Sequence, residues 1–200
     1  MIPKVIHQIW IGPKSPPAYM DGWKMAGFDY VLWNEKRIDK LKLINQKHYD
    51  YFLKKRIYYG AADIARVEIL HQYGGLYVDA DTIRLRDLPE EWFDASFFAV
   101  ETNRAEGKKY RVANGVMASE KGGKVMAQYI KRIQKAKKIE PCWSTIGGTM
   151  LTSIIKEYQD VLILEPYTFY PVNSKGLVHP RADEAYARHE WGSKHPELYI

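Results

Sequence analysis

A helix-like segment that runs directly into a strand-like segment constrains this chain most strongly. Residues 60–75, GAADIARVEILHQYGG, contain good helix formers, apolar residues at helical spacing and a glycine pair suited to a left-handed helix end. Residues 76–81, LYVDAD, follow at once as an apolar run that ends in Asp79 and Asp81. A helix that leads straight into a buried strand is typical of α/β proteins.

The remaining segments extend this pattern over the chain. Residues 4–11, KVIHQIWI, are apolar on both alternating faces, which is typical of a strand covered on both sides in a parallel sheet. We predict a mainly parallel central sheet in a single Rossmann-like domain spanning residues 1–200, with residues from about 180 to 200 as a tail or active-site lid. The same reading predicts strands at 29–35, 96–102, 110–119 and 161–172, helices at 38–56, 122–138 and 146–158, and a helical turn or two within 16–27.

Composition and charge narrow the class of protein and of partner. The single cysteine, Cys142, excludes an intramolecular disulfide, and no Cys/His cluster has zinc spacing. No segment approaches the roughly 18 apolar residues of a membrane span, so we expect a soluble or peripherally membrane-associated, cytoplasmic protein. The net charge of +6 favours an anionic partner: a nucleotide, a phospholipid surface, a lipid diphosphate or nucleic acid.

The acidic pair at the end of the predicted strand points to a metal site. If Asp79 and Asp81 continue the strand, its period of two places both carboxylates on one side. Carboxylate oxygens suit Mg²⁺ or Mn²⁺, which commonly bridge phosphate oxygens. Ligands of open α/β sheets bind beyond the carboxyl ends of the strands, where this pair falls. The alternative is an ordinary turn, since aspartate is common after strands.

The preceding helix carries a second charged pair. Asp63 and Arg66 lie three residues apart, so they share one helix face. They can form a simple helical ion pair, or both can reach the same ligand. Because their helix leads directly to Asp79 and Asp81, the order along the chain favours a shared ligand.

These residues resemble a known family. The stretch AADIARVEILHQYGGLYVDAD, with the opening IPKVIHQIWIG, resembles the DXD-type sugar transferases of glycosyltransferase family 32. That family includes initiating α-1,6-mannosyltransferases and capsular polysaccharide enzymes, and the glucosylating domain of large bacterial toxins is a distant relative. The resemblance spans about residues 3–195 and keeps the family's central pattern except at Ala62, where a serine is usual.

The resemblance implies a GT-A fold that binds a nucleotide-sugar, and it implies roles for the four charged residues. Asp81 would coordinate Mn²⁺ (or Mg²⁺) directly. Asp79 would contact the nucleotide ribose or donor sugar and reach the metal through water. Asp63 and Arg66 would bind donor-sugar hydroxyls, with Arg66 also near the diphosphate.

Further motifs imply substrate contacts. Trp10, with Ile9 before it, matches the position whose ring stacks on the nucleotide base, although a core tryptophan is an equally ordinary reading. Asn114 and Gly115 match a family segment at the donor or acceptor pocket, although Asn-Gly is also a common tight-turn pair. Gly147 lies in TIGGTML, which corresponds to a segment usually written Thr-Gly-Pro before a helix, and Gly148 replaces the proline here.

The segment RHEWGSKH departs from the family's C-terminal pattern. The family usually has two adjacent histidines, then tryptophan, then Ser-Trp. Here His189 and Trp191 remain, Glu190 replaces the second histidine and Lys194 stands where the second tryptophan is expected. His189 is the expected additional metal ligand, with Glu190 as a possible substitute. Trp191 and Ser193 are expected to close over the diphosphate, and Lys194 is expected to help neutralise the charge on it.

The predicted activity is metal-dependent hexosyl transfer with retention of configuration. The resemblance favours UDP-hexose as donor, with GDP-mannose second, and a glycan, lipid-linked or protein acceptor. Three alternatives stay open at this point: the same chemistry on modified bases of DNA, a noncatalytic nucleotide-sugar-binding module, and a metal-dependent phosphohydrolase.

Overall fold

A six-stranded sheet forms the centre of the computed structural model, which describes residues 1–102 and 109–192. Its strands lie in the order β2-β1-β3-β6-β5-β7, and only β6 runs antiparallel to its neighbours. The mainly parallel α/β sheet predicted from the sequence is therefore confirmed. The strands are β1 (Val5–Ile9), β2 (Asp29–Trp33), β3 (Gly75–Val78), β5 (Phe97–Glu101), β6 (Val112–Ser119) and β7 (Leu162–Leu164).

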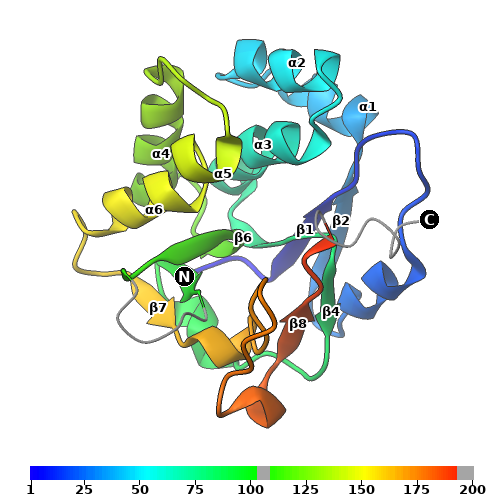
Figure 1. Cartoon of the computed structure of the whole chain (residues 1–200), viewed down its shortest axis with the longest axis vertical. Coiled ribbons are helices and arrows are strands. Elements are labelled where there is room, and N and C mark those ends of the chain that lie inside the picture. The colour runs from blue at the N-terminus through cyan, green and yellow to red at the C-terminus, as the bar shows by residue number, and fades with distance from the viewer. Residues whose placement is uncertain (103–108, 193–200) are drawn as a thin grey trace.

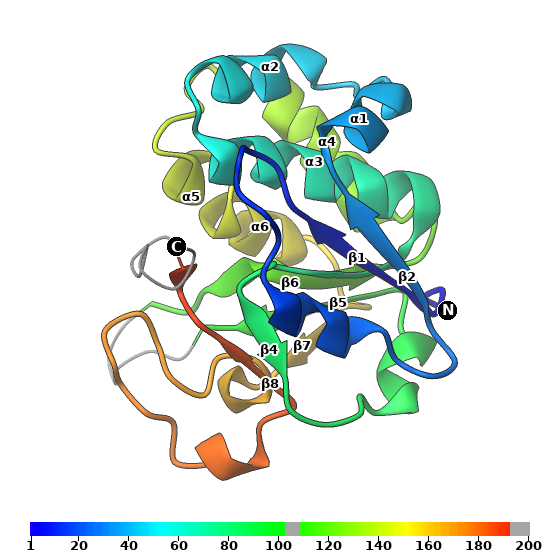
Figure 2. The same ribbon diagram turned by 90° about the vertical axis from the view of Figure 1, so that its right-hand side faces the viewer.

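The helices gather on one face of this sheet, as Figures 1 and 2 show. The longest, α3 (Tyr58–Tyr73), has every residue from Gly60 to Leu70 buried, because α2 and α4 cover the sides that the sheet leaves open. Gly60 permits this contact, since a Cβ there would lie 2.6 Å from a ring carbon of Phe52. The other helices are α1 (Glu35–Ile38), α2 (Gln46–Lys54), α4 (Lys124–Gln134), α5 (Cys142–Thr145) and α6 (Gly148–Ile155).

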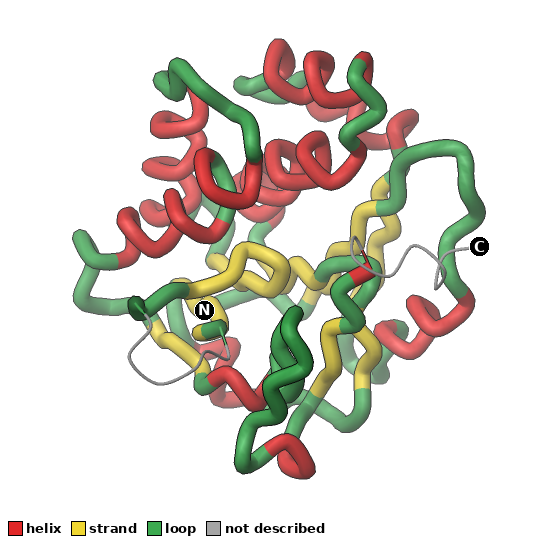
Figure 3. The backbone as a smooth tube through the Cα atoms, in the orientation of Figure 1, coloured by secondary structure: helices red, strands yellow, loops and turns green. Residues whose placement is uncertain are grey.

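The opposite face is covered by a small second sheet and loops (Figures 2 and 3). Strand β4 (Thr82–Arg84) pairs antiparallel with β8 (Ala187–His189), and Thr82 lies opposite His189. Alternate residues of the central strands thus enter two cores. Tyr77 packs with the helices, whereas Leu76 and Val78 pack on the other side against Phe169 and its neighbours.

Several element boundaries differ from the sequence-based prediction. Strand β3 ends at Val78, before the acidic pair, and the strand expected over 161–172 is only three residues long. The helix expected over 38–56 is interrupted, because Lys42 adopts a left-handed backbone conformation with φ of 52°. Asn114 and Gly115 lie inside β6, so the tight-turn interpretation of that pair is wrong.

None of the helices within residues 1–102 and 109–192 combines the length and the apolar character needed to cross a membrane.

Candidate active site

Asp79, Asp81 and His189 converge just beyond the end of β3. The amide of Asp79 still donates to the Gly115 carbonyl at 2.7 Å, and the chain then turns, with the Thr82 amide donating to the Asp79 carbonyl at 3.0 Å. Because the strand has ended, a turn and not period-two alternation brings the two carboxylates together. The β4–β8 pairing then places His189 Nε2 3.2 Å from Asp81 Oδ1 and 3.5 Å from Asp79 Oδ2.

The geometry and donor set of this cluster suit a divalent cation. One ligand atom from each of the three residues lies within 4.8 Å of the others. Burial lowers the pKa of His189, but the adjacent carboxylates of Asp81 and Asp79 outweigh it and raise the pKa overall. The two carboxylates therefore favour a positive charge between them, and a bound cation provides such a charge.

The structure separates the two candidates for the additional ligand. The carboxylate of Glu190 forms an ion pair with Arg188, while the Glu190 amide donates to the Asp81 carbonyl at 2.8 Å. His189 instead faces both carboxylates of the pair, and its Nδ1 accepts the Trp191 amide at 3.0 Å. Of these two candidates, His189 is the one in position to complete the cluster.

Arg66 connects the cluster to helix α3. Its guanidinium is buried, with Nη2 3.0 Å from Asp79 Oδ1 and 3.3 Å from Asp63 Oδ1. The Tyr77 hydroxyl donates to the same Asp79 oxygen at 2.7 Å, and the Arg66 guanidinium stacks 4.6 Å from the Tyr77 ring centre. Arg66 thus pairs with Asp63 within the helix and also reaches Asp79, so the two residues do not form an isolated helical ion pair.

The electrostatics differ between the two carboxylates that Arg66 contacts. Burial raises the pKa of Asp79, but Arg66 and His189 outweigh it, so that pKa is lowered overall. The pKa of Asp63 is raised, because burial outweighs the attraction of Arg66. Asp79, a member of the cluster, is thus held ionised, whereas Asp63 ionises less readily.

Strand β6 closes the site from the other side. Asn114 Nδ2 donates to Asp63 Oδ1 at 2.7 Å, and the Asn114 carbonyl accepts from Arg66 Nη1 at 2.8 Å. A Cβ on Gly115 would lie only 2.4 Å from Asp79 Oδ2. A glycine at position 115 therefore leaves the space that the Asp79 carboxylate occupies.

Three residues of this network were not predicted from the sequence. Tyr77 precedes Asp79 by two residues, and residues two apart in a strand point to the same side, so this spacing could have identified Tyr77. Gln8 is fully buried and its side-chain amide donates to the Asp79 carbonyl at 3.3 Å. The Cys142 thiol is buried and hydrogen-bonded to Asp63, and burial and then Asp63 raise its pKa. Neither Gln8 nor Cys142 belongs to a motif that identifies such a role.

Three further residues were predicted as substrate contacts: Trp10, Ile9 and Gly147. Trp10 follows β1, is half-buried, belongs to neither core and donates its indole N–H to the Lys14 carbonyl at 2.6 Å, so the core-tryptophan interpretation is wrong. Ile9 is 4% exposed and its side chain packs in the helix-side core instead of the site. Gly147 precedes α6, where its carbonyl accepts the Tyr129 hydroxyl at 2.9 Å.

Trp191 lies over the cluster, with its ring centre 4.5 Å from that of His189 and its indole N–H donating to the Val172 carbonyl at 2.9 Å. Ser193 and Lys194 lie outside the described residues.

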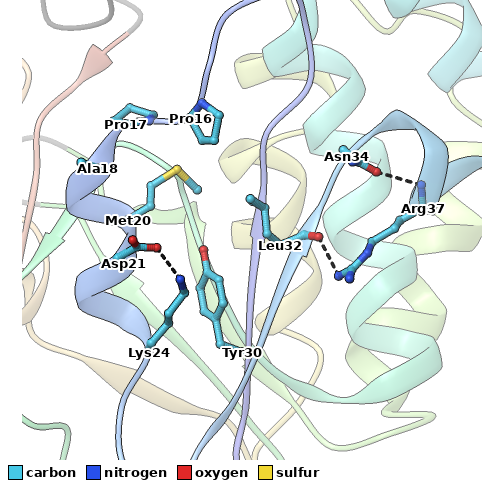
Figure 4. A pocket seen from close by; sticks show the side chains of 10 residues that line it. All are labelled: Pro16, Pro17, Ala18, Met20, Asp21, Lys24, Tyr30, Leu32, Asn34 and Arg37. Atoms are coloured by element: carbon cyan, nitrogen blue, oxygen red, sulfur yellow. Dashed lines mark hydrogen bonds and ion pairs between the residues drawn. The ribbon is translucent and has the colours of Figure 1, made fainter.

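A pocket of about 490 Å³ lies between β2 and the 3-10 helix Ala18–Trp23 (Figure 4). Tyr30, which lines it, donates its hydroxyl to Gln8 Oε1 at 2.9 Å. Gln8 in turn reaches the Asp79 carbonyl, so two side chains join the pocket wall to the backbone of the acidic turn.

Both the sequence and the fold of this chain are similar to those of known proteins. A model of the capsular polysaccharide synthesis protein family matches residues 27–136, more than half of the chain. An uncharacterized glycosyltransferase, L373, of Acanthamoeba polyphaga mimivirus is 26% identical over 86% of this chain and 74% of its own length. Inositol phosphoceramide mannosyltransferase 3 of Schizosaccharomyces pombe is 32% identical over 40% of this chain, which corresponds to 24% of the yeast protein's length.

Among solved structures, the PaToxG glycosyltransferase superposes with a TM-score of 0.61 at 17% identity, covering 78% of this chain and 69% of its own. This similarity concerns the fold, which is the GT-A fold expected from the sequence. The chain therefore belongs to the capsular polysaccharide synthesis protein family and is a glycosyltransferase, in agreement with its resemblance to glycosyltransferase family 32.

Proposed function

We propose that this chain transfers a hexose from a nucleotide-diphosphate sugar to a glycan, lipid-linked or protein acceptor with the help of a divalent cation. The observation that carries the proposal is the convergence of Asp79, Asp81 and His189 next to the buried guanidinium of Arg66. Negative ligands for a cation and a fixed positive charge thus lie at one site, which suits a diphosphate leaving group.

Asp79, Asp81 and His189 would hold the cation, Mn²⁺ or Mg²⁺, with Asp81 as the direct ligand and Asp79 partly through water. When bound, such a cation neutralises charge that develops on the leaving diphosphate. Arg66 provides a second positive charge. Its contacts with Asp63, Asp79 and the Asn114 carbonyl fix the guanidinium in place before a donor arrives.

Asp63 and Asn114 would orient the donor sugar through its hydroxyl groups. Asn114 donates to Asp63, so protein contacts position the polar atoms of both side chains. The bond from the anomeric carbon to the phosphate oxygen breaks, and a bond to the acceptor oxygen forms on the same face. The leaving phosphate oxygen takes the acceptor's proton, so this retaining step requires no separate protein base.

The choice of nucleotide and sugar rests on the family resemblance. UDP-hexose is the first choice, with Trp10 stacking on the base. GDP-mannose is the second, and the similarity to a mannosyltransferase supports keeping it in the test. The named relatives are glycosyltransferases, so a noncatalytic binding module is not favoured.

Exposed aromatic side chains near Asp63 support a carbohydrate acceptor. Trp143 is 59% exposed and directly follows Cys142, whose thiol contacts Asp63. Tyr59, 58% exposed, lies in the first turn of α3, close enough for Cys142 and Asp63 to add to the rise in its pKa that desolvation causes. Exposed aromatic rings at the rim of a polar site provide apolar faces against which a sugar can pack.

The C-terminal region, from about residue 180, would act as the lid of a single catalytic domain. It supplies His189 and Trp191 to the site. We propose that Ser193 also covers the diphosphate and that Lys194 helps neutralise its charge. Limited proteolysis with and without UDP or GDP and Mn²⁺ tests this role. Protection of the region on binding is expected, and unchanged cleavage would contradict a lid.

A donor panel tests the proposed function. The chain is incubated with UDP- and GDP-sugars, Mn²⁺ and simple glycan acceptors, and the products are separated and their anomeric configuration is determined by NMR. Transfer with retention from one donor is expected. Release of sugar phosphate, or a product of inverted configuration, would contradict the proposal.

A further inference from the structure

Tyr170 is a buried residue beside the acidic cluster whose hydroxyl has no hydrogen-bond partner within residues 1–102 and 109–192. The side chain is 1% exposed. Its ring centre lies 5.4 Å from that of His189 and 5.7 Å from that of Trp191. The Tyr170 ring therefore packs against His189, one of the three cluster residues, and against Trp191.

The hydroxyl of Tyr170 points toward the carboxylates. A Cβ on Gly115 would lie 3.1 Å from this hydroxyl oxygen and 2.4 Å from Asp79 Oδ2, so both atoms border the same point. A tyrosine hydroxyl carries its proton at neutral pH, since its ordinary pKa is about 10. The group therefore acts as a hydrogen-bond donor.

The carboxylate oxygens of the cluster contact other groups, and none of them accepts the Tyr170 hydroxyl. Asp79 Oδ1 accepts from Tyr77 and Arg66, and Asp79 Oδ2 faces His189. Asp81 Oδ1 also faces His189, and Asp81 Oδ2 accepts the Gly192 amide at 2.8 Å.

The backbone N–H of Val116, which is near the phenol oxygen, is itself a donor and cannot accept the hydroxyl proton. The hydroxyl is therefore poised for an acceptor that the described part of the protein does not supply.

An unpartnered buried hydroxyl is not sufficient evidence of a binding site. Tyr49, in α2, is fully buried and also has an unpartnered hydroxyl among the described residues, yet none of the cluster residues affects its pKa. Tyr170 differs because the orphaned donor borders the place where Asp79, Asp81 and His189 present ligand atoms to one another. A buried donor without a partner is costly, and an acceptor that arrives with the ligand removes that cost.

We propose that the Tyr170 hydroxyl donates a hydrogen bond to an oxygen that binds together with the cation at Asp79, Asp81 and His189. That oxygen belongs either to a water on the cation or to the diphosphate of the donor. Tyr170 is a positioning residue in this scheme, which rests on the proposed function. The shared chemistry is an oxygen ligand of a divalent cation.

The test compares Tyr170→Phe with Tyr49→Phe as a matched control, since both remove a buried, unpartnered hydroxyl. Calorimetry first measures the affinity for Mn²⁺ alone, then the affinity for UDP and GDP at saturating Mn²⁺. If a coordinated water accepts the hydrogen bond, Tyr170→Phe binds Mn²⁺ about tenfold more weakly. If a diphosphate oxygen accepts it, Mn²⁺ affinity is unchanged and the affinity for the nucleotide diphosphate falls by a similar factor.

Thermal unfolding of the cation-free variants separates positioning from folding. Removing an unpartnered hydroxyl leaves the Tm of Tyr170→Phe equal to or above that of the wild type, so weaker binding is not a consequence of damage to the fold. Binding of Mn²⁺ and of both nucleotides by Tyr170→Phe with wild-type affinity would overturn this role alone. Failure of the wild type to bind either ligand would instead overturn the proposed function and this inference with it.

Discussion

Arg66 and Asp79 form an ion pair, with Nη2 3.0 Å from Oδ1, that joins helix α3 to the turn after strand β3. The pair fixes the carboxylate next to Asp81 and His189 and leaves the positive charge of Arg66 at the same place. One contact thus contributes both to the stability of the fold and to the proposed binding of a diphosphate.

Replacement of Arg66 by methionine is expected to destabilise the protein. The variant leaves the buried Asp63 and the partly exposed Asp79 without the Arg66 guanidinium, and removing one partner of a buried ion pair costs about 3 kcal/mol. Urea denaturation measures the loss. Lys4→Met, which breaks an exposed pair with Glu90, is the control and is expected to leave stability unchanged. Equal effects of the two substitutions would contradict the account.

Gly115→Ala is expected to impair the site directly. The added methyl group would lie 2.4 Å from Asp79 Oδ2, so the carboxylate must move away from His189 and Arg66. We expect at least about a tenfold loss of Mn²⁺-dependent donor turnover, on the scale of a misplaced catalytic group. Gly22→Ala is the matched control, because a Cβ there meets no atom within 4 Å. Wild-type turnover by Gly115→Ala would show that the carboxylate position is not critical.

Trp143→Ala is expected to weaken acceptor binding selectively. The exposed indole offers an apolar face next to the donor site, so its loss raises the KM for a glycan acceptor about tenfold, on the scale of a stacked aromatic contact. The KM for the donor stays constant. Ile44→Ala removes a similarly exposed apolar side chain on the loop before α2 and serves as the control. An unchanged acceptor KM would remove Trp143 from the acceptor site.

The buried His7 is expected to make folding sensitive to acid. Its Nδ1 accepts the Trp33 indole N–H at 3.1 Å and its Nε2 donates to the Gly74 carbonyl at 2.9 Å, so the neutral ring is fully satisfied. Burial lowers the pKa to about 4, although the Gly74 carbonyl opposes the shift. The unfolded chain therefore binds a proton, at a pKa near 6.5, before the folded chain does.

The resulting stabilisation is complete above about pH 6.5 and is lost as the pH falls toward 4, by up to about 3 kcal/mol. Unfolding free energies measured across this range, for the wild type and His7→Gln, isolate the contribution of this residue. The wild type should lose more stability than the variant. Parallel curves would show that His7 titrates normally in the folded protein.

The parts of the fold that were predicted correctly are those that a local pattern of apolar and polar residues specifies. The helix around Asp63 and the strands β1, β3 and β6 carry long apolar runs with clear ends, so their positions were correct to within a few residues. The interpretation of Asn114 and Gly115 as a turn failed because the glycine leaves room for the Asp79 carboxylate, a contact between strand β6 and the turn after β3.

The parts that could not be predicted depend on distant pairing. The strands β4 and β8 have three residues each, and their pairing brings His189 to Asp79 across 110 positions of the chain. The family resemblance named His189 as a metal ligand beside Asp79 and Asp81, but the strand pairing that brings it there was not predicted. The orphaned hydroxyl of Tyr170 and the thiol contact of Cys142 with Asp63 arise only from tertiary packing, which no local pattern specifies.

We expect Asp79 and Asp81 to hold a cation that binds the donor's diphosphate. Mn²⁺-dependent release of UDP or GDP from the preferred donor is measured for the wild type, Asp81→Asn and the control Asp87→Asn, whose side chain is 91% exposed. Asp81→Asn is expected to lower release by at least about a hundredfold, while Asp87→Asn matches the wild type. Undiminished release by Asp81→Asn would show that Asp81 does not hold a cation that the reaction needs.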